Sequence, residues 1–197
     1  MGHYYTDNRD LKSQKREIAF NYHGKTLRFQ SDLGVFSKDN IDYGSRVLLE
    51  TFEPLENLAL LDVGCGYGAV ALSLAAAGRN LQCDLIDVNG RALELARDNA
   101  SMFQLDQIRI YESSCYQNVQ GVYDLIVSNP PIRAGKQIVH EILSGSYAHL
   151  NQGGELRIVI QKKQGAPSAK AKMEEVFGNC QILKRDKGYY ILSSVKK

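Results

Sequence analysis

The stretch Leu-Asp-Val-Gly-Cys-Gly-Tyr-Gly, residues 61–68, joins the end of an apolar run to a loop with three glycines. The run covers residues 58–63, and its apolar character is typical of a strand buried on both faces. The alanine-rich residues 69–77 follow the loop, and we expect them to form a helix that ends at Gly78. A strand, a glycine-rich turn and a helix in this order indicate an open α/β sheet that can bind a nucleotide-like cofactor at the turn.

Strands and helices continue to alternate after this first unit. Apolar runs predict strands over residues 82–87, 108–111, 123–127 and 156–161. Helices are predicted over residues 90–102 with Asn89 as the N-cap, over a segment from Val139 to Leu150, and from a cap at Ser168 to Gly178.

The end of the chain differs from these units. Two strands, residues 181–184 and 189–195, are separated by only four residues, which permits an antiparallel hairpin but no parallel crossover. Five alternating units and a terminal hairpin predict a Rossmann-like α/β fold. Its open sheet should be mostly parallel, with helices on both faces and an antiparallel strand at its end.

The chain before residue 58 is expected to form a small extension. Residues 17–31 predict two short strands around a His23-Gly24 turn, and residues 44–52 predict a short helix that ends before Pro54. We therefore divide the chain into an N-terminal β-hairpin extension and loop, residues 1–40, and an α/β domain, residues 41–197.

The composition is that of a globular protein, with 44% hydrophobic and 23% charged residues. No run approaches the roughly 18 apolar residues of a membrane span, and the four cysteines and four histidines follow no zinc-binding spacing. The simplest expectation is a reduced, cytoplasmic protein that uses no metal and no membrane.

Basic residues are concentrated at the two ends of the chain. The net charge is +2, but residues 1–30 hold six Lys or Arg against three Asp or Glu, and residues 161–197 hold nine against three. These ends suit a polyanion such as RNA. An ordinary solvated surface would have the same composition.

The glycine-rich loop is the first candidate binding site. Its glycines let the backbone approach a ligand closely, and the following helix offers free N–H groups. Asp87 ends the next strand about 20 residues later, where a carboxylate can accept both hydroxyls of a ribose. The residues expected to bind the cofactor here are Asp62, Gly64, Cys65, Gly66, Gly68, Asp87 and Val88. NAD-dependent dehydrogenases and methyltransferases share this pattern, and a tight turn without a ligand is a third possibility.

The tripeptide Asn129-Pro130-Pro131 follows the strand 123–127 and favours one chemistry. The carboxyl ends of strands in an open sheet face one crevice, so the tripeptide should lie beside the glycine-rich loop. The side-chain oxygen of Asn129 and the carbonyl of Pro130 can accept both hydrogens of an exocyclic NH₂ group. This would direct the lone pair of a planar nitrogen at a methyl donor, so Asn129, Pro130 and Pro131 are the predicted catalytic residues of an N-methyltransferase.

On these residues the chain resembles the small-subunit (16S) ribosomal RNA guanine-N2 methyltransferases, and especially their short single-domain branch. The resemblance extends over residues 31–37, 60–68, 87–89, 128–136 and 161–167, and Asn129–Lys136 is its most specific part. It implies a seven-stranded sheet, S-adenosylmethionine as the methyl donor, and guanine N2 in ribosomal RNA as the acceptor. By position, residues 62–68 would bind the methionine end of the cofactor, Asp87 its ribose, and Asn129 both cofactor and target amine.

Two positions depart from the family pattern. Many relatives carry an aromatic residue after the prolines to stack on the base, whereas this chain has Ile132, and Phe36 is a candidate substitute. An Asp or Asn often binds the adenine amine at the position where this chain has Ser114. Adenine N6 and a protein glutamine amide therefore remain alternative acceptors, and an RNA-binding module with weak catalysis is a further alternative.

Basic residues near the predicted catalytic loop complete the list of expected contacts. Arg133 and Lys136 follow the prolines and, with Phe36 and Ile132, form the predicted substrate-binding residues. Lys162 and Lys163 follow the fifth strand. Contacts with phosphates of RNA, in ribosomal RNA or the small ribosomal subunit, are the favoured role for these four cations, and a solvated loop is the alternative.

Overall fold

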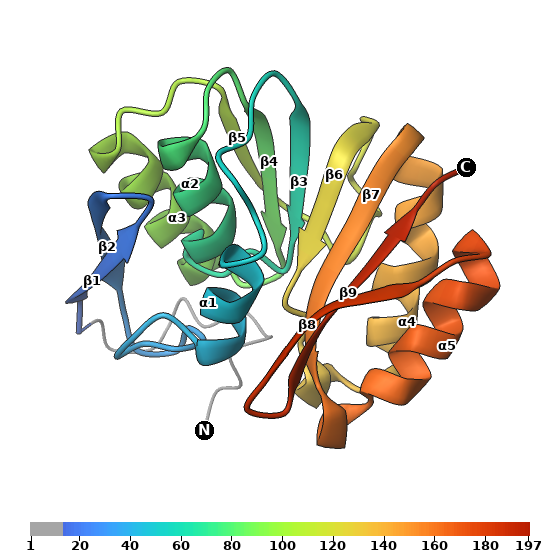
Figure 1. The fold of residues 1–197 in the computed structure, drawn as a ribbon. Coiled ribbons are helices and arrows are strands. Elements are labelled where there is room, and N and C mark those ends of the chain that lie inside the picture. The colour runs from blue at the N-terminus through green and yellow to red at the C-terminus, as the bar shows by residue number, and fades with distance from the viewer. Residues whose placement is uncertain (1–13) are drawn as a thin grey trace.

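The computed structural model describes residues 14–197, which form two β-sheets and the helices around them (Figure 1). The strands are β1 (Arg16–Tyr22), β2 (Lys25–Ser31), β3 (Ala59–Val63), β4 (Gln82–Asp87), β5 (Ile108–Glu112), β6 (Tyr123–Ser128), β7 (Leu150–Gln161), β8 (Gln181–Asp186) and β9 (Tyr189–Val195). The α-helices are α1 (Tyr43–Leu49), α2 (Ala69–Ala77), α3 (Gly90–Met102), α4 (Lys136–Gly145) and α5 (Ala166–Phe177). Three short 3-10 helices are η1 (Ile132–Ala134), η2 (Ser146–His149) and η3 (Lys162–Gln164).

The larger sheet has seven strands in the order β5-β4-β3-β6-β7-β9-β8. Strands β3 to β7 are mutually parallel, and β9 is antiparallel to both β7 and β8. The predicted Rossmann-like, seven-stranded sheet with its terminal hairpin is therefore confirmed. The antiparallel strand is second from the edge, because β8 folds back outside β9.

Helices cover both faces of this sheet, as predicted. Figure 1 shows α1, α2, α3 and the β1–β2 hairpin on one face, and α4 and α5 on the other. Each face has its own buried apolar cluster. The parallel strands end at the lower edge of the sheet in Figure 1, where the loops after β3, β4 and β6 come together.

Several predicted element boundaries were wrong. Helix α1 ends at Leu49 rather than at residue 52, and the fifth parallel strand, β7, begins at Leu150 rather than at residue 156. Helix α5 begins at Ala166, directly after Gly165 with its φ of 113°, so Ser168 lies inside the helix and is not its cap. Leu150 does not extend the helix that contains Val139, because it is the first residue of the long strand β7. The turn of the terminal hairpin has two residues rather than four, because β8 continues to Asp186.

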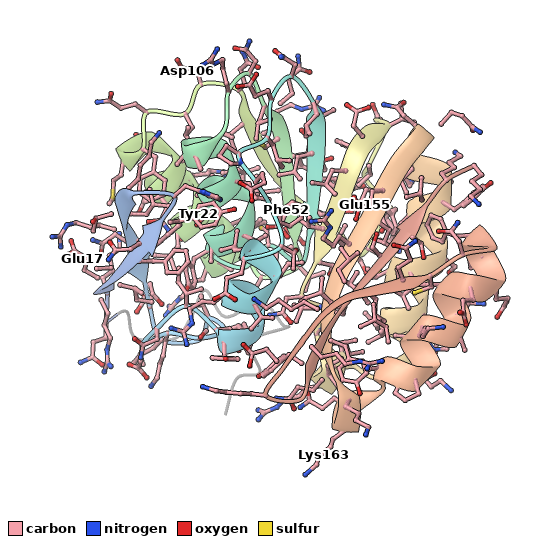
Figure 2. The ribbon with its side chains drawn as sticks, viewed as in Figure 1. Glu17, Tyr22, Phe52, Asp106, Glu155 and Lys163 are labelled. Carbon is pink, nitrogen blue, oxygen red and sulfur yellow. The ribbon has the colours of Figure 1, made fainter. Side chains whose placement is uncertain are left out.

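Helix α1 is anchored to the sheet at its carboxyl end by Arg157 of β7. The Arg157 guanidinium lies 3.9 Å from the centroid of the Phe52 ring and donates to the backbone oxygen of Thr51 at 2.7 Å. It also forms an ion pair with Glu155 at 2.7 Å, and Figure 2 shows Phe52 and Glu155 close together at this position. The anchor fixes the helix whose first residues face the carboxyl edge of the sheet.

The β1–β2 hairpin packs against the same apolar cluster as α2 and α3. Asn99 of α3 exchanges hydrogen bonds with the backbone of Gln30, at 2.6 Å and 3.0 Å, and donates to the Tyr67 carbonyl at 2.9 Å. The predicted hairpin around His23-Gly24 is confirmed. The division at residue 40 stays a prediction, and its residues 1–13 lie outside the described part of the chain.

Candidate active site

A cavity of about 330 Å³ opens at the carboxyl edge of the sheet, between the loops that follow β3, β4 and β6. This volume is within the range of small-molecule sites, about 300–1,000 Å³. Predicted residues from all three loops line it, including Asp62, Gly64, Asp87, Asn129, Pro130 and Pro131. The two motifs that the sequence placed in one crevice therefore share one cavity.

The glycine-rich loop needs backbone conformations that favour glycine. Gly64, Gly66 and Gly68 have φ values of 74°, 57° and 88°, in the left-handed region. A Cβ atom on Gly66 would contact nothing within 4 Å in the protein, and one on Gly64 would lie 4.0 Å from Pro131 Cδ. The space beside Gly64 and Gly66 thus belongs to the cavity, and it is bounded on the far side by the proline loop.

Gly68 differs from its two neighbours. It is buried, it is not among the cavity-lining residues, and a Cβ atom on it would lie 2.6 Å from Leu72 Cδ1. Its place as the N-cap of α2 requires a positive φ and close packing. Gly68 therefore shapes the turn, and its predicted contact with the cofactor stays a prediction.

Most N–H groups of the loop are already engaged in hydrogen bonds. The N–H groups of Gly64 and Cys65 donate to the Ile86 carbonyl at 2.9 Å and 3.0 Å, and that of Gly68 donates to the Cys65 carbonyl at 3.0 Å. Cys65 itself is buried and lines the cavity. These bonds make the loop rigid, so its own contribution to binding is mainly shape and close approach.

Asp87 connects the loop to the end of β4. Its carboxylate accepts hydrogen bonds from the backbone N–H of Gly66 and of Asn89, each at 2.9 Å. Burial raises the pKa of Asp87, and these two N–H groups act in the opposite direction. A carboxylate has about four acceptor positions, so the side chain that lines the cavity can also accept from the hydroxyls of a ribose.

Asp62 lies beneath the loop at the end of β3 and also lines the cavity. It is 2% exposed and accepts a hydrogen bond from the Ala71 N–H at 3.1 Å. Burial raises the pKa of Asp62 to about 7, the Ala71 N–H acts against this shift, and the nearby Asp87 adds to it. Among the described residues no cation forms an ion pair with Asp62, so a bound ammonium group would stabilise its charged form.

Asn129 is held at the cavity by two hydrogen bonds from its amide nitrogen. Nδ2 donates to Asp42 Oδ2 at 2.9 Å and to Ser45 Oγ at 3.0 Å. Both partners belong to the start of α1, where Asp42 is the N-cap and accepts from the Ser45 N–H. No donor among the described residues reaches Asn129 Oδ1, which remains an open acceptor.

Asp42 is the residue that fixes which way the Asn129 amide points. A carboxylate only accepts hydrogen bonds, so it binds the NH₂ side of the amide and repels the oxygen. The Ser45 hydroxyl can donate or accept and would tolerate either orientation. The position of Asp42 therefore directs Asn129 Oδ1 away from α1.

The two prolines supply a second open acceptor. Pro130 and Pro131 have no N–H, and within the described chain no hydrogen bond to the Pro130 carbonyl is present. The Pro131 carbonyl, in contrast, accepts from the Ala134 N–H at 2.9 Å and starts η1. Asn129 Oδ1 and the Pro130 carbonyl are thus the acceptors that this loop leaves for a ligand.

The remaining predicted residues divide into two groups. Val88, Ser114 and Phe36 line the cavity, with Phe36 on the exposed side of the loop after β2. Ile132, Arg133 and Lys136 do not line it. Ile132 packs against the apolar cluster of α4 and α5, because η1 turns the chain immediately after Pro131.

Arg133 and Lys136 are exposed, as are Lys162 and Lys163. No ion pair of these four residues is present within the described part of the protein. Their positions are compatible with contacts outside the cavity, and their predicted role in binding phosphates stays a prediction.

Sequence reasoning missed several residues that shape the cavity, and Asp42 and Ser45 are the most important. The signal was present, because Asp42 lies two residues before the predicted helix and is a preferred N-cap residue. Its contact with Asn129 joins positions 87 residues apart and has no local signature. Other lining residues that were not predicted include Ser37, Ser113, Cys115, Ala134, Ile138 and Ile142.

The loop after β2 is fastened over the cavity by the start of α3. Asn89 Nδ2 donates to the Gly34 carbonyl and Arg91 to the Leu33 carbonyl, both at 3.0 Å. Phe36 and Ser37 are thereby brought to the rim of the cavity. Residues 31–37, one of the segments in which the chain resembles the methyltransferase family, therefore contribute to the site.

Residues 14–197 contain no cluster of His, Cys, Asp and Glu able to bind a metal ion, and no helix among them is long and apolar enough to cross a membrane. The four cysteines are free thiols.

Comparisons with known proteins agree with this arrangement. A family model described as the methyltransferase small domain matches residues 26–193. The chain is 46% identical to the uncharacterised Bacillus subtilis protein YbxB, over 98% of both chains. It is 34% identical to the ribosomal RNA small subunit methyltransferase C of Erwinia tasmaniensis, over 83% of this chain and 48% of that protein.

A solved structure gives the same result for the fold. The 16S rRNA N2 methyltransferase RsmC of T. thermophilus, determined in complex with AdoMet and guanosine, superposes with a TM-score of 0.85 and 25% identity. The match covers 95% of this chain and 52% of RsmC. The chain thus spans about half the length of the ribosomal RNA methyltransferases that it matches. Because the family model covers most of the chain and the glycine-rich loop, Asp87 and the Asn-Pro-Pro loop share one cavity, the chain belongs to the methyltransferase small domain family, whose methyl donor is S-adenosylmethionine.

Proposed function

We propose that this chain transfers a methyl group from S-adenosylmethionine to the exocyclic N2 of a guanine in small-subunit ribosomal RNA. One observation carries the proposal. Asp42 orients the Asn129 amide so that its oxygen is open, and the neighbouring Pro130 carbonyl is also open, in the cavity that contains the cofactor loop. Two acceptors placed together suit the two hydrogens of an NH₂ group.

The cavity residues fit the donor. Gly64 and Gly66 leave space for a ligand against the loop, Asp87 offers acceptor positions for the ribose hydroxyls, and Asp62 offers a buried carboxylate for the amino group of the methionine end. Ser114 also lines the cavity, and its hydroxyl would accept a hydrogen bond from the adenine amine. When bound, S-adenosylmethionine supplies a methyl group on a positively charged sulfur. The chemistry of an NAD-dependent dehydrogenase would not require the two open acceptors of the Asn-Pro-Pro loop.

The protein acts on the target nitrogen by holding it. The lone pair of an aryl amine is conjugated with the ring, so the free amine is a poor nucleophile. Asn129 Oδ1 and the Pro130 carbonyl would accept its two N–H groups and direct the lone pair toward the methyl group. The same oxygens stabilise the positive charge that develops on nitrogen. The proton is then lost to solvent from a strongly acidic cationic nitrogen, so the site needs no basic side chain.

Guanine in ribosomal RNA is supported by the relatives. The Erwinia protein is a ribosomal RNA small subunit methyltransferase C, and the T. thermophilus enzyme carries guanosine beside AdoMet. Phe36 lines the cavity and Ile132 does not, so we assign the covering of a base to Phe36. A base in a folded RNA would have to leave its stack to enter such a cavity.

The test is methyl transfer from labelled S-adenosylmethionine to unmodified small ribosomal subunits, naked small-subunit RNA, DNA and bulk protein, followed by digestion and identification of the labelled product. We expect label in N2-methylguanosine from RNA. Label in N6-methyladenosine or in protein glutamine would show that adenine or glutamine, and not guanine, is the methyl acceptor. Tight cofactor binding without transfer to any of these substrates would favour a non-catalytic RNA-binding module.

A further inference from the structure

We propose that Arg46 of α1 and Lys187 of the β8–β9 turn bind phosphates of the RNA strand next to the target nucleotide. This inference rests on the proposed function, because it takes RNA as the partner. It adds a docking surface that neither the cavity nor the resemblance assigns. We call the two residues, together with Tyr43 between them, the hairpin rim.

The hairpin rim adjoins the catalytic loop through a continuous set of contacts. Asp42, which holds Asn129, directly precedes Tyr43. A Cβ atom on Gly44 would lie 2.8 Å from the Tyr189 ring, so α1 packs directly against β9. The rings of Tyr43 and Tyr189 have their centroids 5.7 Å apart. An RNA strand that leaves the cavity past Asn129 would therefore meet this surface first on the α1 side.

The Tyr43 ring organises the two cations without neutralising them. The Arg46 guanidinium lies 5.1 Å from the ring centroid and the Lys187 ammonium 4.8 Å from it. Both distances are within the range of cation–π interactions, about 6 Å. The Tyr43 hydroxyl donates to Asp186 at 3.0 Å, which fixes the ring. The ring thus keeps two flexible side chains near one position.

Both cations keep their charge available. Arg46 and Lys187 are exposed, and in the region that the structure describes neither forms an ion pair. Lys184 on the same hairpin is different, because Glu50 pairs with it. Asp186, next to Lys187 in the chain, accepts the hydrogen bond from Tyr43 and forms no ion pair with either cation among the described residues. The rim is therefore a cationic surface rather than a network of internal salt bridges.

A second pair of cations continues the surface. The Lys162 N–H donates to the Gly188 carbonyl at 2.8 Å, which joins η3 to the hairpin turn. Lys163 follows Lys162 and points away from the protein at the lower end of Figure 2, at the edge opposite Asp106. The basic end of the chain, residues 161–197, thereby places part of its charge at the carboxyl end of β7, next to the hairpin turn.

The chemistry of the rim favours RNA over a protein partner. The exposed large apolar side chains of the described chain are Phe36, Met102, Val122, Leu183 and Val195, and none belongs to α1 or the hairpin turn. Protein interfaces are built around buried apolar anchors and are depleted of lysine. Phosphate backbones require fixed cations at an exposed edge, which the rim provides.

The experiment measures RNA binding separately from methyl transfer. Wild-type protein, Arg46→Gln, Lys187→Gln and the double variant are titrated into a short, fluorescent, guanine-containing single-stranded RNA over a range of salt concentrations. Arg79→Gln is the control for charge lost elsewhere, because Arg79 is an exposed cation at the opposite end of the strands, where it forms an ion pair with Glu56 at 4.0 Å. Melting temperature and affinity for S-adenosylhomocysteine are measured for every variant to confirm an intact fold and cofactor site.

We expect the fall of log affinity with log salt concentration to become less steep by about 0.7 in each single rim variant and by about 1.4 in the double variant. One phosphate contact on a single strand contributes about 0.7 to this slope. Arg79→Gln should match the wild type. Unchanged slopes in the rim variants, or equal losses in the control, would overturn the proposal. So would normal RNA binding combined with lost methylation of assembled subunits, because that result indicates a protein contact. Binding requires no turnover, so the rim can be confirmed even if the acceptor proves not to be guanine.

Discussion

Replacing Asn129 with alanine removes the side-chain acceptor on which the proposed chemistry depends. The two hydrogen bonds from Nδ2, at 2.9 Å and 3.0 Å, hold Oδ1 in place before any substrate binds. Loss of one preorganised group that stabilises developing charge typically costs about 2.7–4 kcal/mol in the transition state, or about a 10²–10³-fold fall in turnover. We expect a fall of this size in Asn129→Ala.

Cofactor affinity should change little in this variant. The loop that contains Gly64 and Gly66 is held by Ile86 and Asp87 through bonds that do not involve Asn129. The free energy of unfolding should fall by about 1 kcal/mol, because Asp42 keeps its bond from the Ser45 N–H. Calorimetric titration with S-adenosylhomocysteine and thermal melting measure these two quantities.

The matched control is Asn179→Ala. Asn179 also donates from Nδ2 to two oxygens, the carbonyls of Phe177 and Val195, and it is not among the cavity-lining residues. Single-turnover methylation with saturating cofactor compares both variants with the wild type. Near-normal turnover in Asn129→Ala, or an equal loss in Asn179→Ala, would refute the assigned role.

Three further substitutions test other parts of the site. Asp42→Ala should lower turnover more than Ser45→Ala, because only the carboxylate fixes the amide orientation; comparable losses in steady-state assays would argue against this. Asp62→Asn should weaken S-adenosylmethionine binding and raise the melting temperature. The pKa of Asp62 rises from 3.8 to about 7 on burial, so its favourable contribution is full below 3.8 and lost as pH rises through 7. The gain should therefore be largest above pH 7 and vanish near pH 4, and a pH-independent gain would contradict the shift. Gly68→Ala should destabilise the fold by about 1–3 kcal/mol in denaturant titrations, since its φ is 88° and its Cβ would meet Leu72. A change smaller than that would show that the turn can adapt.

Much of the fold follows from local patterns in the chain. Residues 69–77 and 90–102 form helices with the predicted bounds, and the N-cap at Asn89 accepts from the Ala92 N–H. Short-range signals of this kind depend on periodicity and capping, which a sequence displays directly. Predicted boundaries were wrong where a local signal had two interpretations. A serine such as Ser168 is suited both to the N-cap of a helix and to a position inside it.

The site was predictable only in part, for a related reason. The crevice rule for open sheets placed Asn129 beside residues 64–68, and the cavity confirms that proximity. The direction of a side chain after a tight turn was not predictable: Ile132 was expected at the base, and in the structure it packs against the apolar cluster of α4 and α5. The contact of Asp42 with Asn129 depends on how α1 is anchored by Arg157 of β7, which no motif specifies.

The central claim is that the exocyclic amine of guanine, held by Asn129 and Pro130, is the methyl acceptor. The most direct measurement compares methyl incorporation into two small-subunit RNA transcripts, one with guanosine and one with inosine, which lacks only that amine. We predict methylation of the guanosine transcript, with all label recovered as N2-methylguanosine, and none of the inosine transcript. Equal incorporation into both transcripts would contradict the account.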